Sequence, residues 1–167
     1  MTRRLTEAIS RLYRRPLDGT RQVFALSRPE AERLPRLPWV AIISITGPGR
    51  LPAELDGFEH VLRVSFADTD FLNPELSPRA QAALGDAFTA EQAKSIRQFV
   101  ESLPSEIASI VVHCEGGYSR SSAIALALHR LCGYEVALAR LTEANPSVLR
   151  VMLGEGRPRW KANRSRI

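Results

Sequence analysis

The sequence predicts a single α/β domain in three layers, with a central, mostly parallel sheet flanked by helices. Short β-rich apolar runs alternate with amphipathic helical stretches along the chain. One run, residues 107–112, is apolar except for Ser109, as expected of a central strand covered on both faces. The length of 167 residues favours one domain, and 44% hydrophobic with 25% charged residues excludes a wholly disordered, collagenous or coiled-coil chain.

The first expected elements are strands. Residues 22–26 are predicted to form a short strand, and residues 39–45 form a buried one rich in β-branched side chains. Residues 61–66 alternate in side-chain character and are predicted as the third strand. Residues 73–85 show little periodicity and are predicted as an irregular connection.

Helices follow in the second half of the chain. Thr89 and Gln92 form a capping box at the start of a helix that Pro104 ends. After the strand at 107–112, a small Gly-rich loop leads into a helix over about 121–132, which Gly133 stops. A further helix is predicted over about 135–144, and a last short one from Ser147.

The charge distribution divides the chain into a basic N-terminal extension (1–21), a domain (22–153) and a basic C-terminal tail (154–167). The net charge of +5 is carried by the two ends, and the middle is mildly acidic. Residues 1–20 have the pattern of a basic amphipathic helix, and we interpret them, like the Arg-rich end at 157–167, as loose solubilising extensions. Contact with a membrane surface or a partner is the alternative. The acidic middle argues against a specific nucleic-acid partner.

Several classes of protein are excluded by what the sequence lacks. Two cysteines cannot form the disulfide framework of a secreted domain, and no secretory signal is recognisable. The longest strongly apolar stretch, residues 39–45, is too short for a transmembrane segment. Because the cysteines cannot form a disulfide framework, a reduced, cytoplasmic compartment is expected. His60, His113 and His129 are scattered and form no spaced ligand set, so neither a metal nor another cofactor is expected.

The most informative segment is VVHCEGGYSRSS, residues 111–122, at the predicted junction of strand, loop and helix. Successive backbone N–H groups in such a turn converge on a concavity that the helix dipole makes positive, and an anion of phosphate size fits there. Arg120, at the helix start, adds two parallel donors to the same anion.

Other side chains of this segment suit the same anion site. The positive field acts on Cys114, which we expect to be presented as a thiolate beneath the anion. Gly116 and Gly117 permit positive φ and a close approach of the backbone. Ser121 is placed to donate a hydrogen bond to the Cys114 sulfur, and His113 to bond backbone carbonyls and add positive potential if it is protonated.

Each of these residues also has a purely structural interpretation. Cysteine is often a small buried hydrophobe, His113 could be a satisfied core histidine, and the glycine pair could form only a turn. The structural interpretation does not account for Cys, Gly, Arg and Ser at these offsets in one turn, so their combination favours a functional site.

His113-Cys114-x-x-Gly117-x-x-Arg120-Ser121 resembles the signature loop of the cysteine-dependent protein tyrosine phosphatases. The string HCEGGYSRS is most similar to the small dual-specificity branch, bacterial members included, and the resemblance extends over about residues 22–153. It implies a signature loop between the last strand and a helix, a Cys114 nucleophile and a phosphate held by Arg120 and the loop. That loop consists of Glu115, Gly116, Gly117, Tyr118 and Ser119.

The resemblance also implies a general acid on a separate loop. Residues 62–70 are similar to the stretch that carries the acid in the dual-specificity branch, and this makes Asp68 the general acid with Asp70 as the alternative. One of the two acids could instead stabilise a turn. The Trp-Pro-Asp loop of the large tyrosine-specific enzymes is absent.

Three further residues need separate interpretation. An anionic Glu115 beside an anion site is expected to face the rim and to favour a basic flank on the substrate. Tyr118 is also expected at the rim, where it stacks on an aromatic leaving group or simply packs. Cys132 is expected in the core, with a redox partnership with Cys114 as the alternative.

These observations predict a cysteine-dependent phosphomonoester hydrolase whose substrate is a phosphorylated protein carrying phosphotyrosine, with phosphoserine and phosphothreonine as further candidates. Two alternatives remain at this point: the same chemistry on a phosphoinositide, a nucleotide or an RNA 5′ phosphate, and a phosphoprotein-binding module of low turnover. The sequence leaves the oligomeric state open.

Overall fold

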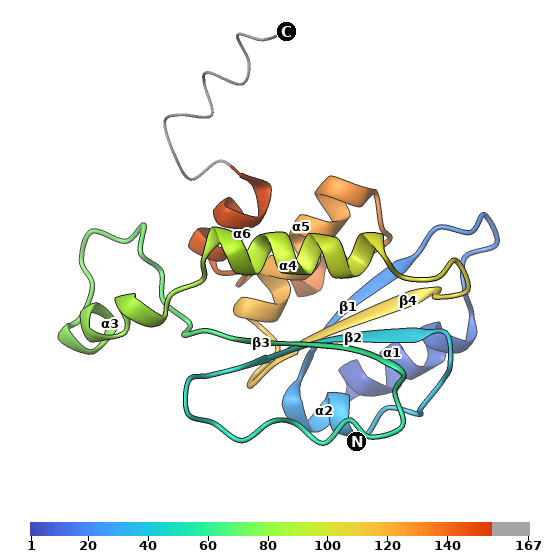
Figure 1. Ribbon diagram of the computed structural model, residues 1–167. Coiled ribbons are helices and arrows are strands. Elements are labelled where there is room, and N and C mark those ends of the chain that lie inside the picture. Colours follow the sequence, from blue (N-terminus) through green and yellow to red (C-terminus); the bar gives the residue numbers. More distant parts are fainter. Residues whose placement is uncertain (155–167) are drawn as a thin grey trace, which may run out of the picture.

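Four parallel strands form the central sheet of the computed structural model, which describes residues 1–154 (Figure 1). Their order across the sheet is β1-β4-β2-β3, so the two central strands are β4 and β2. The strands span Gln22–Ser27 (β1), Val40–Thr46 (β2), His60–Ser65 (β3) and Ser109–Cys114 (β4). With helices on both faces, this arrangement confirms the predicted three-layer α/β domain.

Two groups of helices cover the two faces of the sheet (Figure 1). Helices α1 (Arg3–Tyr13) and α2 (Arg28–Glu32) lie on one face, and α4 (Ala90–Glu101), α5 (Arg120–Cys132) and α6 (Pro146–Leu153) on the other. The short helix α3 (Pro78–Ala82) and the 3₁₀ turn η1 (Leu84–Asp86) interrupt the connection at 73–85 that the sequence predicts as irregular.

Strand β4 carries the apolar run that predicts a central strand. Its side chains alternate between the two faces, as the period of a strand requires. Ile110 and Val112 pack in the core with α5, whereas Val111 packs in the core with α1. The parallel register places Ser27 beside Cys114 and Ser44 beside His113. The carboxyl ends of three strands therefore meet where β4 delivers Cys114, which is where open parallel sheets bind ligands.

The N-terminal segment is not a loose extension, and that expectation is wrong. Leu5, Ala8 and Leu12 of α1 are buried against residues of β1, β2 and β4. The helix itself is as predicted and is capped by Thr2, whose hydroxyl accepts a hydrogen bond from the Leu5 amide. The apolar stripe of the helix covers a sheet face that would otherwise be exposed, and this outweighs the looseness common at chain ends.

The helix predicted over 135–144 does not form. Glu135 instead extends the sheet edge: its amide donates to the Arg21 carbonyl, and its carbonyl accepts from the Val23 amide, each at 2.9 Å. A residue that pairs with an edge strand is not available to start a helix, so the segment contains only the 3₁₀ turn η2 (Leu138–Arg140). The pairing covers part of the β1 edge.

The remaining predicted helices are confirmed, with small shifts. Helix α4 begins with the expected capping box of Thr89 and Gln92. Helix α6 starts at Pro146, one residue before the predicted start. Helix α2 is not evident in the sequence because its five residues carry no apolar period; a capping box of Ser27 and Glu30 starts it.

Two expectations concern the surface and the chain end. Cys132 is exposed at the end of α5, so its placement in the core is wrong. The Arg-rich end at 157–167 lies outside the described residues.

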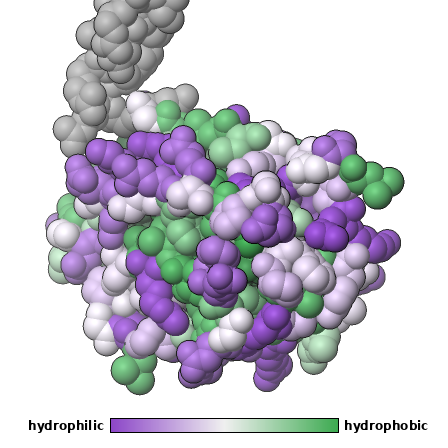
Figure 2. All heavy atoms as spheres, turned by 45° about the vertical axis from the view of Figure 1, so that its right-hand side comes forward, coloured by the Kyte–Doolittle hydropathy of each residue, from purple (hydrophilic) through white to green (hydrophobic). Residues whose placement is uncertain are grey.

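None of the helices in residues 1–154 has the length and apolar character needed to cross a membrane. On the face shown in Figure 2, hydrophobic residues near the centre are surrounded by hydrophilic ones.

Candidate phosphate-binding site

The candidate site is the Cys114 loop, residues 115–119, which joins the end of β4 to the start of α5. The Cys114 side chain is buried and forms the floor of this loop. The Gly117 amide donates a hydrogen bond to the Cys114 sulfur at 3.2 Å, and the Ser121 hydroxyl lies 3.1 Å from the same sulfur. Both contacts favour negative charge on the sulfur, and the contact with Ser121 is the one expected from the sequence.

The backbone of the loop is rich in uncommitted donors. Within residues 1–154, the amide N–H groups of Glu115, Gly116, Tyr118 and Ser119 make no hydrogen bond. They precede the N-terminus of α5, a helix of 13 residues whose dipole adds positive potential at that end. Such a turn can bind a phosphate-sized anion without any side chain.

Arg120 adds a buried cation to the same turn. Its side chain is fixed at one end, where Nη1 donates to the Phe66 carbonyl at 2.9 Å. Its Nε is buried without a hydrogen-bond partner, and no carboxylate of residues 1–154 lies within ion-pair distance. A buried guanidinium with an unsatisfied N–H is unfavourable unless an anion pairs with it, so this side chain is prepared for an anionic ligand.

Of the two loop glycines, only Gly117 is required by backbone geometry. It has φ +78°, and a Cβ there would lie 2.5 Å from the Leu26 carbonyl carbon and the Ser27 nitrogen. A Cβ on Gly116 would meet nothing closer than the Tyr118 ring at 3.6 Å. The loop therefore packs directly on the junction of β1 and α2, at Gly117.

His113 supports the loop from beneath as a neutral ring. Burial lowers the pKa of His113 below its usual 6.5, with a smaller opposing effect from its hydrogen bond to the Cys114 backbone. A neutral ring donates from Nδ1 to the Cys114 carbonyl (3.2 Å) and accepts at Nε2 from the Ser44 hydroxyl (2.6 Å). The expected bond to a backbone carbonyl is confirmed; the positive charge considered for a protonated ring is not supplied near neutral pH.

The two candidate acids have different partners. The exposed Asp68 reaches the Cys114 loop, because its Oδ1 accepts from the Ser119 hydroxyl at 2.7 Å. Asp70 faces α6 instead, and its Oδ1 accepts from the Ser147 hydroxyl at 2.6 Å and from the Leu72 amide at 3.2 Å. The structure therefore brings Asp68, and not Asp70, into contact with the loop.

Asn145 is a member of the site that the sequence does not reveal. This buried side chain donates from Nδ2 to Asp68 Oδ1 at 2.8 Å, while its Oδ1 caps α6. Its backbone amide donates to the Ser119 carbonyl at 3.0 Å. Asn145 thus ties α6, the acid and the Cys114 loop together. An Asn before a Pro indicates a helix start, but nothing local indicates contact with Asp68.

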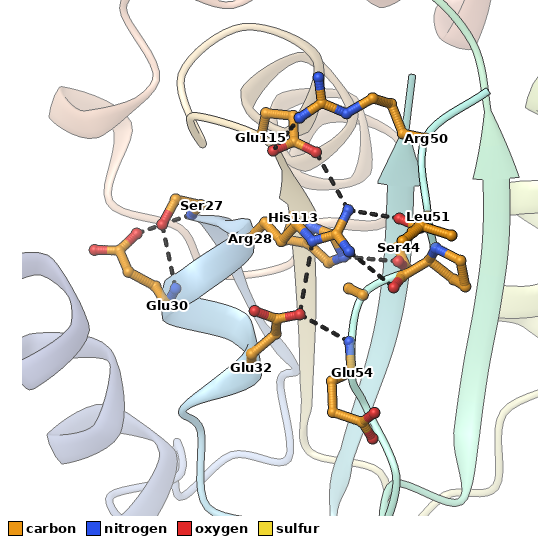
Figure 3. A network of polar contacts seen from close by, with 12 residues as sticks. Ser27, Arg28, Glu30, Glu32, Ser44, Arg50, Leu51, Glu54, His113 and Glu115 are labelled. Carbon is orange, nitrogen blue, oxygen red and sulfur yellow. Dashed lines mark hydrogen bonds and ion pairs between the residues drawn. The ribbon is translucent and has the colours of Figure 1, made fainter. Parts of the chain in front are cut away.

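Glu115 faces the rim, as expected, and lies among arginines of the chain itself (Figure 3). Its carboxylate pairs with Arg28 at 3.4 Å and with Arg50 at 3.6 Å. Arg28 also donates to the Leu51 carbonyl at 2.6 Å and the Pro52 carbonyl at 2.8 Å, and so holds the segment after β2 beside the site. The sequence predicts that the negative charge of Glu115 favours a basic flank on the substrate. In the structure this charge is already paired with Arg28 and Arg50.

Tyr118 lies at the rim of the Cys114 loop, as the sequence predicts. Tyr118 is 53% exposed at the rim, and its ring packs on the guanidinium of Arg4, 4.5 Å away. Arg4 belongs to α1, the helix that the sequence predicts to be loose.

Cys132 lies at the far end of α5, and 13 residues of helix amount to roughly 18 Å at the rise of an α-helix. Cys132 is therefore not placed to pair with Cys114.

Within residues 1–154, no three His, Cys, Asp or Glu side chains are grouped as metal ligands would be. Comparisons of the chain with protein-family models, with curated proteins and with solved structures find no match.

Proposed function

We propose that this chain hydrolyses phosphate monoesters on proteins through a phosphocysteine intermediate. One observation carries the proposal: within residues 1–154, Arg120 Nε is buried without a partner and four loop amides make no hydrogen bond, all in the turn whose Gly117 amide donates to the buried Cys114 sulfur. The resemblance of residues 113–121 to the phosphatase signature supports the same chemistry.

In the first step the Cys114 sulfur attacks phosphorus. A sulfur–phosphorus bond forms while the bond from phosphorus to the leaving oxygen breaks. Arg120 Nε and the loop amides hold the equatorial oxygens, and this charge complementarity supplies most of the acceleration of a phosphoryl transfer. Asp68 gives a proton to the departing oxygen, so that no unstabilised alkoxide or phenolate is released.

In the second step water releases the phosphate. The Asp68 carboxylate takes a proton from a water molecule while the water oxygen attacks phosphorus, and the sulfur–phosphorus bond breaks. The Ser121 hydroxyl stabilises the sulfur as it leaves, from its position 3.1 Å away. Dividing one difficult displacement into two easier ones is the contribution of the cysteine nucleophile.

Two contacts support Asp68 rather than Asp70 in these proton transfers. Ser119 and Asn145 both donate to Oδ1 of Asp68, and its Oδ2 makes no hydrogen bond within residues 1–154. The proton is therefore carried on Oδ2, while Oδ1 fixes the orientation of the carboxyl group. Asp70, bonded to α6, is the alternative.

The arrangement at the rim supports a protein substrate over a more highly charged one. A phosphoinositide, a nucleotide or an RNA 5′ end would need uncompensated cations beside the loop. Arg28 and Arg50, which lie beside the loop, are both engaged in ion pairs with Glu115.

The decisive experiment measures phosphate release from an aryl phosphate in the presence of a metal chelator. We expect the wild type and Cys132→Ser to be active and Cys114→Ser to be inactive, because only Cys114 lies in the donor-rich loop. Activity that survives in Cys114→Ser would eliminate the phosphocysteine mechanism. Binding of a phosphopeptide without turnover by the wild type would identify a binding module instead of an enzyme.

A further inference from the structure

Arg4 of α1 contacts the centre of the Cys114 loop from outside. Its Nη2 donates to the Gly116 carbonyl at 3.0 Å and its Nη1 to the Gly117 carbonyl at 3.1 Å. The side chain is only 13% exposed, and the Tyr118 ring covers it. The Gly117 carbonyl also accepts a longer bond, 3.4 Å, from the Ser122 hydroxyl. A residue at the start of the chain thus holds two consecutive carbonyls of the candidate site.

These contacts determine where the opposite ends of the same peptide groups point. In a trans peptide the C=O and the N–H point in opposite directions. The peptide between Gly116 and Gly117 has Arg4 at its carbonyl and the Cys114 sulfur at its N–H, 3.2 Å away. The next peptide has Arg4 at the Gly117 carbonyl, so the Tyr118 N–H is directed away from Arg4.

Arg4 also acts on these peptides electrostatically. A cation at a carbonyl oxygen polarises the amide and makes its N–H a stronger donor, since hydrogen bonds in a chain strengthen one another.

Glu30 of α2 keeps Arg4 in this position. The Glu30 Oε1 accepts from Arg4 Nε at 2.9 Å and from Nη2 at 2.5 Å, and also from the Ser27 amide at 2.8 Å. Burial acts to raise the pKa of Glu30, but hydrogen bonds from Arg4, Thr2 and Ser27 outweigh it and lower the pKa to about 2. Glu30 leaves α2 on the side opposite Glu32 (Figure 3) and remains ionised at neutral pH.

We propose that Arg4, held by Glu30, is a positioning residue for phosphoryl transfer at Cys114. It orients and polarises the two peptide groups whose N–H bonds face the sulfur and the phosphate, and it touches neither the substrate nor the reacting atoms. This inference rests on the proposed phosphatase function. It makes α1 part of the functional unit of the chain.

The test uses three sets of variants in a Cys132→Ser background, which leaves Cys114 as the only thiol. Arg4→Met combined with Glu30→Gln removes both charges together, since removing one alone leaves a buried unpaired charge. The side-chain amide oxygen that Glu30→Gln introduces can still accept from the Ser27 backbone amide. Arg4→Lys is the conservative variant. Arg3→Ala is the matched control, because the Arg3 side chain is 91% exposed and, among residues 1–154, its one ion pair is with Glu7.

Two readouts separate positioning from a merely structural role. One is kcat and KM for an aryl phosphate, and the other is the rate of Cys114 alkylation by iodoacetamide at neutral pH. For the double variant we expect kcat/KM to fall about 10- to 100-fold, less than the loss of a direct oxyanion donor. We also expect slower alkylation, intermediate values for Arg4→Lys, and wild-type values for Arg3→Ala.

The outcomes are distinguishable. If the folded double variant and Arg4→Lys both retain wild-type kcat/KM and alkylation rates, the inference is wrong whatever the fate of the proposed function. If the wild type lacks phosphatase activity, the proposed function fails, and alkylation alone decides whether Arg4 acts on the sulfur. If the double variant does not fold, Arg4→Lys decides, because it keeps a positive charge beside Glu30 but cannot bond both carbonyls and Glu30 as the planar guanidinium does.

Discussion

Gly116 and Gly117 are adjacent in the loop, but only Gly117 has a backbone conformation and surroundings that require glycine. Gly117→Ala would place a Cβ 2.5 Å from backbone atoms of Leu26 and Ser27 in a residue with φ +78°. We expect this substitution to lower the free energy of unfolding by about 3 kcal/mol or more and to abolish phosphate release.

Gly116→Ala is the matched control for this prediction. Its Cβ would meet only the Tyr118 ring, at an ordinary contact distance of 3.6 Å. Urea denaturation of both variants provides the measurement. Equal destabilisation by the two substitutions would show that the packing of Gly117 on the β1–α2 junction is not what constrains the loop.

The assignment of the general acid can be tested through the leaving group. Asp68→Asn keeps an oxygen that can accept from Ser119 and Asn145, but it removes the transferable proton. We expect turnover of a substrate with a poor leaving group to fall about 100-fold or more, and much less for an activated aryl phosphate.

Asp70→Asn is the control, since Asp70 bonds to Ser147 and the Leu72 amide rather than to the loop. Comparison of kcat for aryl phosphates of graded leaving-group strength gives the answer. A leaving-group effect that appears only in Asp70→Asn would move the acid to that position.

Apart from Asp68, which is indicated by the resemblance of residues 62–70 to the acid-bearing stretch of the dual-specificity branch, the site residues that the sequence predicts lie in one short segment of chain. Cys114, Gly117, Arg120 and Ser121 lie within eight consecutive positions, where backbone geometry fixes their mutual placement. Arg4 and Asn145 are missed because they reach the loop through tertiary contacts with Gly116 and Asp68. No local pattern encodes such a contact, since it depends on how distant elements pack.

At the scale of elements, helix α1 contributes core packing that the sequence alone did not predict. Leu12 is fully buried, and its carbonyl accepts from the Trp39 indole N–H at 2.9 Å. We expect Leu12→Ala to lower the free energy of unfolding by about 2–5 kcal/mol, because it leaves a cavity between α1 and the sheet.

Leu17→Ala provides the comparison for α1, because Leu17 follows the helix and is fully exposed. We expect its effect to remain within about 0.5 kcal/mol. Chemical denaturation of both variants measures the difference. A Leu12→Ala protein as stable as the wild type would mean that α1 does not contribute to the core in solution.

The elements that the sequence predicts correctly are those with a strong local signal. The apolar run of β4 and the capping box of α4 can both be recognised from neighbouring positions in the sequence. The helix expected over 135–144 fails for the opposite reason: the Glu135 amide donates to the Arg21 carbonyl and the Glu135 carbonyl accepts from the Val23 amide, and this pairing overrides the local preference. Glu135 covers the edge of β1, and this edge exists only in the assembled fold. The local sequence of residues 135–144 therefore does not indicate the pairing.

At the scale of the whole molecule, two buried groups make stability depend on pH in the same direction. The pKa of His113 is below 6.5 in the folded state because of burial, so below pH 6.5 the unfolded chain binds a proton that the folded chain does not. For Glu30, hydrogen bonds overcome the opposing effect of burial and lower the pKa from 4.5 to about 2. In both cases the unfolded state binds more protons, so stability falls as the pH falls.

The contribution of Glu30 can be isolated by comparing the wild type with Glu30→Gln. Above about pH 5 the ionised Glu30 holds Arg4, and we expect the wild type to be more stable by roughly 2 kcal/mol after allowing for solvent screening. As the pH falls from 4.5 toward 2, Glu30 is protonated first in the unfolded chain and then in the folded one, so this difference shrinks. Urea denaturation of both proteins at a series of pH values from 7 to 3 measures it. A difference that stays constant over the whole range would show that Glu30 is not held as an anion by Arg4, and the connection from α2 through α1 to the Cys114 loop would lose its electrostatic basis.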